Sequence, residues 1–148
     1  MNDDDKLKNV RPAPDGWKLG KYPQTFAFHA GPMYFRERGD AVKGKPGVGF
    51  YSEPHHGNLG NVIHGGALMT LADMALFDIC FREYGEFPAV TLSLNADFLN
   101  PGPIGKFIEA GGEITRAGKS IIFVRGMVEA EDTPILSFSG SIKRLSRA

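Results

Sequence analysis

The chain has 148 residues, enough for one domain with a hydrophobic core and too few for two of ordinary size. Lys plus Arg and Asp plus Glu each total 17, so the formal net charge is zero, and neither nucleic acid nor a membrane is an expected partner. Because Cys80 is the one cysteine and long apolar runs are lacking, we expect a cytoplasmic protein without an intramolecular disulfide.

The predicted elements are short extended segments on either side of a single long helix. Residues 1–22 are polar and interrupted by prolines and glycines, which predicts a flexible N-terminal arm, and residues 23–148 form the expected domain. The elements predicted for that domain are a short helix near 24–29, strands at 33–38 and 48–53, a long helix at 67–84, and strands at 89–99, 106–115, 120–130 and 134–145.

The long helix is apolar on nearly every side, which is typical of a helix buried on nearly every side. Its most regular apolar positions recur at intervals of three and four residues: Leu68, Leu71, Ala72, Ala75, Leu76, Ile79 and Cys80. Gly85 follows as a C-cap. Because hairpin-linked antiparallel strands must hide one face, we predict an α+β fold in which an antiparallel sheet wraps around this one central helix.

The apolar circumference of the helix also predicts association of the chain with itself. One sheet cannot enclose a helix on all sides, so a second copy is expected to cover the remainder. A doubly wound α/β fold is disfavoured, because no helical segments separate the strands that follow the helix.

Asp73 is the candidate for chemistry within the helix. It lies among apolar neighbours, where an ionised carboxylate is costly unless it is paired or hydrogen-bonded. The alternative is a carboxylate that faces solvent or joins a local network, but the helix has no clear polar face for it. A carboxylate held in this way suits a general base or a nucleophile. Asp78 lies about 140° further round the helix and is expected to pair with Arg82 instead.

His64, Gly65 and Gly66 directly precede the helix. Backbone N–H groups at a helix start have no intrahelical acceptor, and glycine lets a ligand approach them closely. The Gly65 amide could therefore stabilise a developing oxyanion, although an ordinary glycine-rich turn is the alternative. Because Gly65 and Asp73 are about 12 Å apart along a helix, we expect that a site using both draws them from different subunits.

The stretch NLGNVIHGGALMTLADMA, residues 58–75, combines Asn58, His64-Gly65-Gly66 and Asp73. At these spacings it resembles the PaaI-like branch of the hotdog-fold thioesterase superfamily, over residues 31–145. The resemblance implies a hotdog fold, a homodimer that often pairs into a homotetramer, and hydrolysis of acyl-CoA to a carboxylate and free CoA.

The resemblance also implies roles for individual residues. Asp73 would act as base or nucleophile, and the Gly65 amide would polarise the thioester carbonyl. Asn58 and His64 would support and orient the thioester. Thr91 would hold the water with its hydroxyl, where relatives often have Ser. Relatives also often have Gly at the position of Asn61.

The hairpin between the strands at 106–115 and 120–130 resembles the basic turn with which relatives meet the nucleotide phosphates. The residues concerned are Arg116, Gly118, Lys119 and Ser120. Two cations beside a glycine turn suit a phosphate, and a solvated hairpin tip is the alternative. The C-terminal cations Lys143, Arg144 and Arg147 are expected to be solvated charges.

We expect no metal and no cofactor, because the histidines of this sequence do not follow a familiar zinc spacing. The motif at residues 58–75 and the resemblance make an acyl-CoA thioesterase the leading hypothesis. Two alternatives remain open: an acyl-thioester hydratase or dehydratase, and a non-catalytic acyl-CoA-binding protein.

Overall fold

The computed structural model of the protein describes residues 2–146. Its elements in chain order are α1 (Asp3–Lys8), β1 (Trp17–Leu19), α2 (Phe26–Ala30), β2 (Tyr34–Arg36), the 3-10 helix η1 (Asp40–Val42), β3 (Val48–Tyr51), the 3-10 helix η2 (Pro54–His56), α3 (Gly65–Tyr84), β4 (Ala89–Phe98), β5 (Phe107–Ala117), β6 (Ile121–Ala130) and β7 (Thr133–Arg144).

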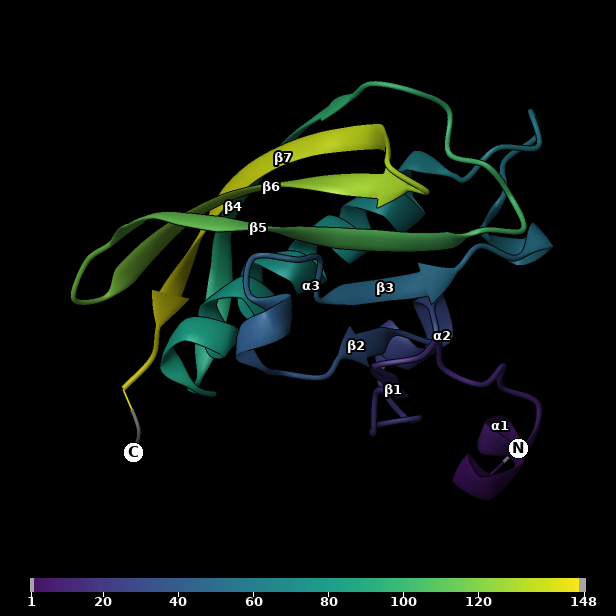
Figure 1. Cartoon of the computed structure of the whole chain (residues 1–148), viewed down its shortest axis with the longest axis horizontal. Helices are drawn as coiled ribbons and strands as arrows, with labels where there is room; N and C mark the ends of the chain where they lie inside the picture. The colour runs from purple at the N-terminus through teal and green to yellow at the C-terminus, as the bar shows by residue number, and fades with distance from the viewer. Residues whose placement is uncertain (1, 147–148) are drawn as a thin grey trace.

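One antiparallel sheet and the long helix α3 form the body of the molecule. The strand order is β1-β2-β3-β5-β6-β7-β4, so β4 and β1 are the two edge strands. The sheet curves over α3, whose axis runs beneath β5, β6 and β7 (Figure 1). The α+β fold predicted from the sequence, an antiparallel sheet wrapped around one long helix, is confirmed.

Helix α3 ends where its sequence predicts but begins two residues earlier, at Gly65. The side chain of His64 caps its start, and Gly85 follows its last residue with φ at 77°, a left-handed conformation that glycine adopts without strain. The face toward the sheet buries Leu68, Leu71, Ala72, Ala75, Leu76 and the predicted core residue Cys80. The face with Thr70, Asp73 and Phe77 is only half-buried in a single chain. Neither α3 nor another helix within residues 2–146 is long and apolar enough to cross a membrane.

Strand β1 corrects the prediction that the sheet begins with β2. Trp17 is buried and pairs with Arg36, whose guanidinium lies 4.6 Å from the Trp17 ring centroid. The three residues of β1 are too few to show the alternation of a strand in the sequence. Their contacts come from β2 and from Phe107 of β5, which are distant in the chain. Residues 17–19 of the segment predicted as a flexible arm therefore belong to the sheet. The division of the chain into an arm at 1–22 and a domain at 23–148 stays a prediction.

The predicted ion pair between Asp78 and Arg82 is present and lies at the base of the loop between β2 and β3. Arg82 Nε donates to Asp78 Oδ2 at 2.8 Å, and Arg82 Nη2 donates to the carbonyl oxygens of Arg36 and Gly47. Burial raises the pKa of the Asp78 carboxyl, and the neighbouring Arg82 counteracts this shift. The pair is structural, because it holds this loop against the last turns of α3.

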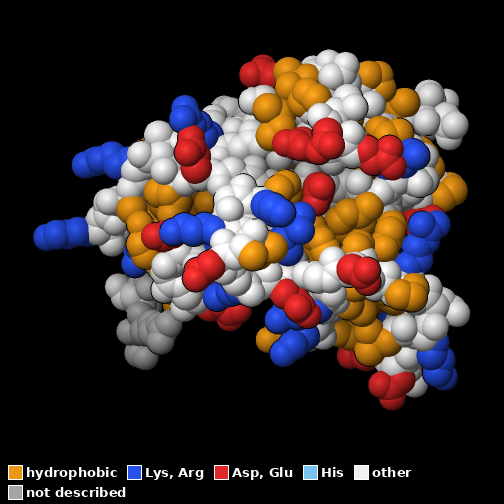
Figure 2. Space-filling view, in the orientation of Figure 1, with side chains coloured by type: hydrophobic (Ala, Val, Ile, Leu, Met, Phe, Trp, Pro, Cys, Tyr) orange, Lys and Arg blue, Asp and Glu red, His pale blue; other side chains and the backbone are white. Residues whose placement is uncertain are grey.

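Charged side chains of both signs occur together on one face of the molecule. Acidic and basic side chains alternate on the face shown in Figure 2, and neither sign forms a continuous area there. This face gives no electrostatic case for nucleic acid.

Candidate functional site

Asp73 and Thr91 form a hydrogen-bonded pair between α3 and the edge strand β4. Thr91 Oγ1 donates to Asp73 Oδ1 at 2.6 Å. Within residues 2–146, the other carboxylate oxygen, Oδ2, has no hydrogen-bond partner. Asp73 is half-buried and Thr91 is exposed, so the carboxylate is less enclosed in a single chain than the sequence predicts. One oxygen is thus oriented by a hydroxyl while the other is available to a water molecule.

A β-bulge lies beside this pair. The pairing of β4 with β7 changes register between Thr91 and Ser93. A bulge re-aims the side chains next to it and is common beside active sites. The sequence has no glycine or proline at this point of β4, so it does not predict the irregularity.

The helix start at His64 and Gly65 offers an unpaired backbone donor. His64 Nδ1 accepts a hydrogen bond from the Gly66 amide at 2.8 Å, and the His64 ring is exposed. The Gly65 amide has no hydrogen-bond acceptor among residues 2–146. Because the helix dipole adds positive potential at this end, the Gly65 N–H suits a developing oxyanion.

Asn58 organises the loop that leads to this helix start. Its Oδ1 accepts hydrogen bonds from the amides of Gly60 at 2.8 Å and Val62 at 3.4 Å. Asn61 has φ at 58°, in the left-handed region that asparagine tolerates better than most residues. Asn61 can therefore stand where relatives have Gly, and the side-chain NH₂ of Asn58 remains available to a ligand.

An open groove of about 350 Å³ lies beside the Gly65 amide. Its walls are largely apolar and comprise Asn58, Val62, Ile63, Gly65, Leu68, Phe98, Leu99, Asn100, Pro101 and Gly102. The Phe98 ring lies so close that a Cβ added to Gly65 would be 3.2 Å from it. The sequence predicts Phe98 and Leu99 only as strand residues. Their exposure at the sheet edge, which marks them as groove residues, is not visible in the sequence.

The structure brings the predicted catalytic residues together in two separate groups. Asp73 and Thr91 form one, and Asn58, His64 and Gly65 form the other at the helix start. Asp73 does not line the groove beside Gly65. Both groups lie under β4, one near Thr91 and the other near Phe98.

The predicted phosphate-binding hairpin lies at the far end of the molecule. Arg116, Lys119 and Ser120 are exposed, and the Gly118 amide closes the turn by donating to the Ile121 carbonyl oxygen at 2.8 Å. In Figure 1 this β5–β6 turn projects beyond the sheet, and basic side chains extend from the same end in Figure 2. Within residues 2–146, no hydrogen bond or ion pair joins Arg116, Lys119 or Ser120 to either catalytic group.

Arg144 corrects the expectation that the C-terminal cations are simply solvated. Its guanidinium carbon lies 4.8 Å from the Tyr84 ring centroid and 4.7 Å from that of Phe87. The Arg144 amide also donates to the Ser120 carbonyl oxygen at 2.7 Å, which ties it to the base of the hairpin. Arg147 lies outside the described residues.

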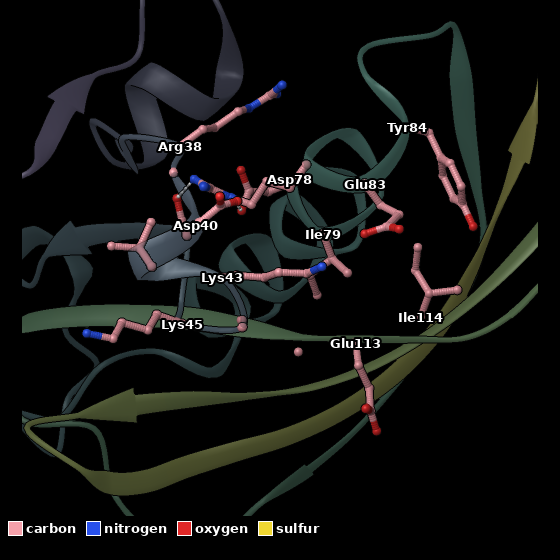
Figure 3. Close-up of a pocket in the computed structure, with 17 residues that line it drawn as sticks. Arg38, Asp40, Lys43, Lys45, Asp78, Ile79, Glu83, Tyr84, Glu113 and Ile114 are labelled. Carbon is pink, nitrogen blue, oxygen red and sulfur yellow. Dashed lines mark hydrogen bonds and ion pairs between the residues drawn. The ribbon is translucent and has the colours of Figure 1, made fainter.

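A larger cavity of about 630 Å³ lies at the opposite end of α3 from the Gly65 groove. Figure 3 shows it between η1 with its flanking loop, the last turns of α3 and β5, with Lys43 and Glu83 pointing inward. No residue that we predicted for the site lines it. Because charges of both signs surround it and its base is the structural Asp78–Arg82 pair, we do not assign the chemistry to it.

Comparison with known proteins agrees with the fold and the motif. The sequence profile of the thioesterase superfamily matches residues 60–136, slightly more than half of the chain. A Pseudomonas aeruginosa protein named provisionally as an esterase is 30% identical over 86 residues, which are 57% of this chain and 64% of that protein. The matched region is thus less than two thirds of that relative's length.

Solved structures resemble the chain over about two thirds of its length. The E. coli PaaI protein from the phenylacetic acid degradation operon aligns with a TM-score of 0.62 and 25% identity, covering 67% of this chain and 71% of that one. A Bacillus halodurans protein solved with CoA aligns with a TM-score of 0.61 and 31% identity, covering 66% and 70%. The chain therefore belongs to the thioesterase superfamily, in its hotdog-fold, PaaI-like branch.

Proposed function

We propose that this protein is an acyl-CoA thioesterase that hydrolyses its substrate to a carboxylate and free CoA. Asp73 acts as general base or nucleophile, with Thr91 beside it, and the Gly65 amide is the oxyanion donor. Asn58 and His64 orient the thioester. The active unit is a homodimer. Two such dimers pair into the homotetramer that the family resemblance implies.

One observation carries this proposal: the two catalytic groups lie near opposite ends of the same free sheet edge, β4. Consider β4 paired antiparallel with the β4 of a second copy, with the two-fold axis passing between the two Asn95 residues, so that facing side chains point to the same side of the sheet. Thr91 of one copy then faces Phe98 of the other, because Leu92 is the extra residue of the bulge between Thr91 and Ser93. Such pairing would bring Asp73 of one subunit toward Gly65 of its partner, at two equivalent sites.

The side chains at this edge support such pairing. Large apolar side chains are exposed on and next to β4, namely Val90, Leu92, Phe98 and Leu99. Exposed apolar groups beside unpaired backbone N–H and C=O groups favour the addition of another strand. The half-buried face of α3 with Thr70, Asp73 and Phe77 would be covered at the same time.

The chemistry follows from the two groups acting on one thioester. In the general-base route, Asp73 Oδ2 takes a proton from a water molecule, and the water oxygen attacks the thioester carbon. The carbonyl oxygen becomes negative and accepts a hydrogen bond from the Gly65 amide. The carbon–sulfur bond then breaks, and Asp73 returns the proton to the leaving thiolate. The products are a carboxylic acid, ionised at neutral pH, and CoA.

The β5–β6 hairpin is the proposed contact for the nucleotide end of CoA, through Arg116, Gly118, Lys119 and Ser120. Within residues 2–146, neither Arg116 nor Lys119 forms an ion pair with an acidic side chain. Two unneutralised cations beside a turn suit a phosphate group. The CoA present with the Bacillus halodurans protein supports the choice of thioester.

The test compares the wild type with Asp73→Asn in a thiol-release assay, using an aryl and a medium-chain acyl-CoA. The variant keeps the size of the side chain and removes the negative oxygen. We expect turnover to fall by about 10² or more, the usual size of a lost general base. Thr91→Val, which removes only the hydroxyl that orients Asp73, should cost less.

Other outcomes point to the alternatives. CoA release by the wild type that Asp73→Asn leaves unchanged would contradict the role of Asp73. Tight binding of acyl-CoA without release of a thiol would indicate a binding protein. Addition of water to an enoyl-CoA without thiol release would indicate a hydratase.

A further inference from the structure

His56 is a buried histidine that the chemistry proposed above does not use. It ends η2, only 5% of its surface is exposed, and its ring packs edge-on against Phe50 with the centroids 4.6 Å apart. Buried polar groups need hydrogen-bond partners, and both ring nitrogens of His56 have them.

These partners determine where the ring carries its proton. Nδ1 accepts a hydrogen bond from the Glu53 amide at 2.9 Å. Because a nitrogen that accepts cannot also carry a proton, the proton lies on Nε2. Nε2 then donates to the carbonyl oxygen of Ala30 at 2.6 Å, with that of Gly31 at 3.1 Å. The ring is therefore neutral, and one tautomer satisfies every contact.

The backbone of His56 continues this connection to the helix start. The His64 amide donates to the His56 carbonyl oxygen at 2.7 Å. His64 in turn is the N-cap of α3, and Gly65 follows it as the first helical residue. Two short hydrogen bonds, from His56 Nε2 to the Ala30 carbonyl and from the His64 amide to the His56 carbonyl, thus connect the end of α2 to the residue that sets the direction of the Gly65 amide.

We propose that His56 is a positioning residue for thioester hydrolysis, and that its neutral, Nε2-protonated ring holds the Gly65 amide in the orientation that meets the oxyanion. The inference rests on the proposed function of Gly65. A backbone donor that shifts by a fraction of an ångström loses much of its effect on a transition state. Protonation of His56 at Nδ1 would set a second N–H against the Glu53 amide and break the hydrogen bond that fixes the orientation of the ring.

The surroundings of the ring favour the neutral form. Burial is the largest influence and lowers the pKa of His56 below its ordinary value of 6.5. The titratable groups that face it are His55, with ring centroids 3.9 Å apart, and Glu53, which is paired with Arg11. Helix α2 presents backbone carbonyls to the ring, and β3 presents Phe50.

The experiment measures kcat and KM from pH 5 to 8, a range that brackets histidine titration, for the wild type, His56→Gln and His56→Asn. Gln keeps an N–H near the Nε2 position and loses the acceptor, whereas Asn keeps the acceptor and loses the N–H. We expect kcat to fall about tenfold or more in both, with KM changed less than about threefold, because the transition-state donor is what moves. The loss of kcat that the wild type shows at acidic pH should shrink in both neutral variants.

His55→Gln is the matched control, because it alters the same residue type at the exposed neighbouring position. It should leave kcat at pH 8 unchanged, and because removal of the His55 charge raises the pKa of His56, it should not diminish the loss of kcat at acidic pH. Amide NMR spectra of the full-length proteins should show a shift of the Gly65 resonance in the His56 variants and not in His55→Gln.

Three results would overturn the inference. One is full kcat in folded His56→Gln and His56→Asn. Another is a lower kcat with the wild-type pH profile and an unmoved Gly65 resonance, which indicates a structural role alone. The third needs no variant: ¹⁵N NMR of the wild type that finds the His56 proton on Nδ1. Absence of thiol release by the wild type would instead refute the proposed function, while the NMR results still test the connection.

Discussion

Gly65 is the residue at which backbone and side-chain roles can be separated most cleanly. It is the first residue of α3, where proline is tolerated because its missing N–H has no intrahelical acceptor. His64 before it has φ at −59° and ψ at 135°, the extended conformation that a residue preceding proline adopts. Proline at this position would therefore delete the amide proton while preserving the helix.

We predict that Gly65→Pro lowers kcat by about 10²–10³, the cost of removing one oxyanion donor. Gly65→Ala adds a Cβ that meets the same exposed Phe98 ring but keeps the N–H, so its loss should be much smaller. Steady-state thiol release and circular dichroism of both variants check this. Equal losses in the two would assign the effect to crowding against Phe98 and not to the amide.

At the scale of elements, β4 combines three properties. It is an edge strand, it contacts Asp73 through Thr91 at one end, and its Phe98 covers Gly65 at the other. The mechanism that we propose uses both ends. A strand with this arrangement is suited to pair with its own copy, because two-fold symmetry then completes both sites at once.

We predict that two inactive variants restore activity when their subunits are mixed. Asp73→Asn supplies an intact Gly65, and Gly65→Pro supplies an intact Asp73, so each mixed dimer has one complete site. Random reassortment of equal amounts after unfolding and refolding should restore about a quarter of wild-type activity, since half of the dimers are mixed. The measurement is thiol release before and after exchange, with each variant exchanged alone as the control. No recovery, with exchange verified by mass spectrometry, would place the whole site within one chain.

At the scale of the whole molecule, His56 connects segments that are distant in sequence. It joins the end of α2 to η2 and, through its carbonyl, to the start of α3. Arg11 adds the N-terminal segment by its ion pair with Glu53, in which the Arg11 Nε and Glu53 Oε1 atoms are 3.0 Å apart. Charging the His56 ring should therefore affect the stability of the domain as well as its activity.

We predict that the free energy of unfolding falls as the pH decreases below the ordinary histidine pKa of 6.5. The pKa of His56 is lowered in the folded state, so the unfolded chain binds the proton first. The stabilisation is complete above pH 6.5 and is lost as the pH falls through the lowered folded pKa. One such proton changes the slope by at most about 1.4 kcal/mol per pH unit. Urea unfolding at several pH values should show a smaller slope for His56→Gln than for the wild type, and equal slopes would contradict the prediction.

Local pattern was enough to predict most of the fold. The apolar periodicity of α3, its glycine C-cap and the turn residues between strands act over a few neighbouring positions. Asp78 and Arg82 are four residues apart on one helix, so their pairing also followed from the sequence. Strand β1 did not, because Trp17 owes its place to Arg36 and Phe107, which are distant in the chain.

Some features of the candidate site likewise follow from the local sequence, and others depend on tertiary packing. The sequence alone determined which residue types could do the chemistry, because Asn58, His64, Gly65 and Asp73 lie in one continuous motif. Only the tertiary structure decided that Thr91 contacts Asp73, that Phe98 lies over Gly65, and that His56 is buried with both ring nitrogens bonded. The physical reason is that these contacts depend on how β4 and α2 pack against α3, and packing joins residues whose separation along the chain carries no periodic signal.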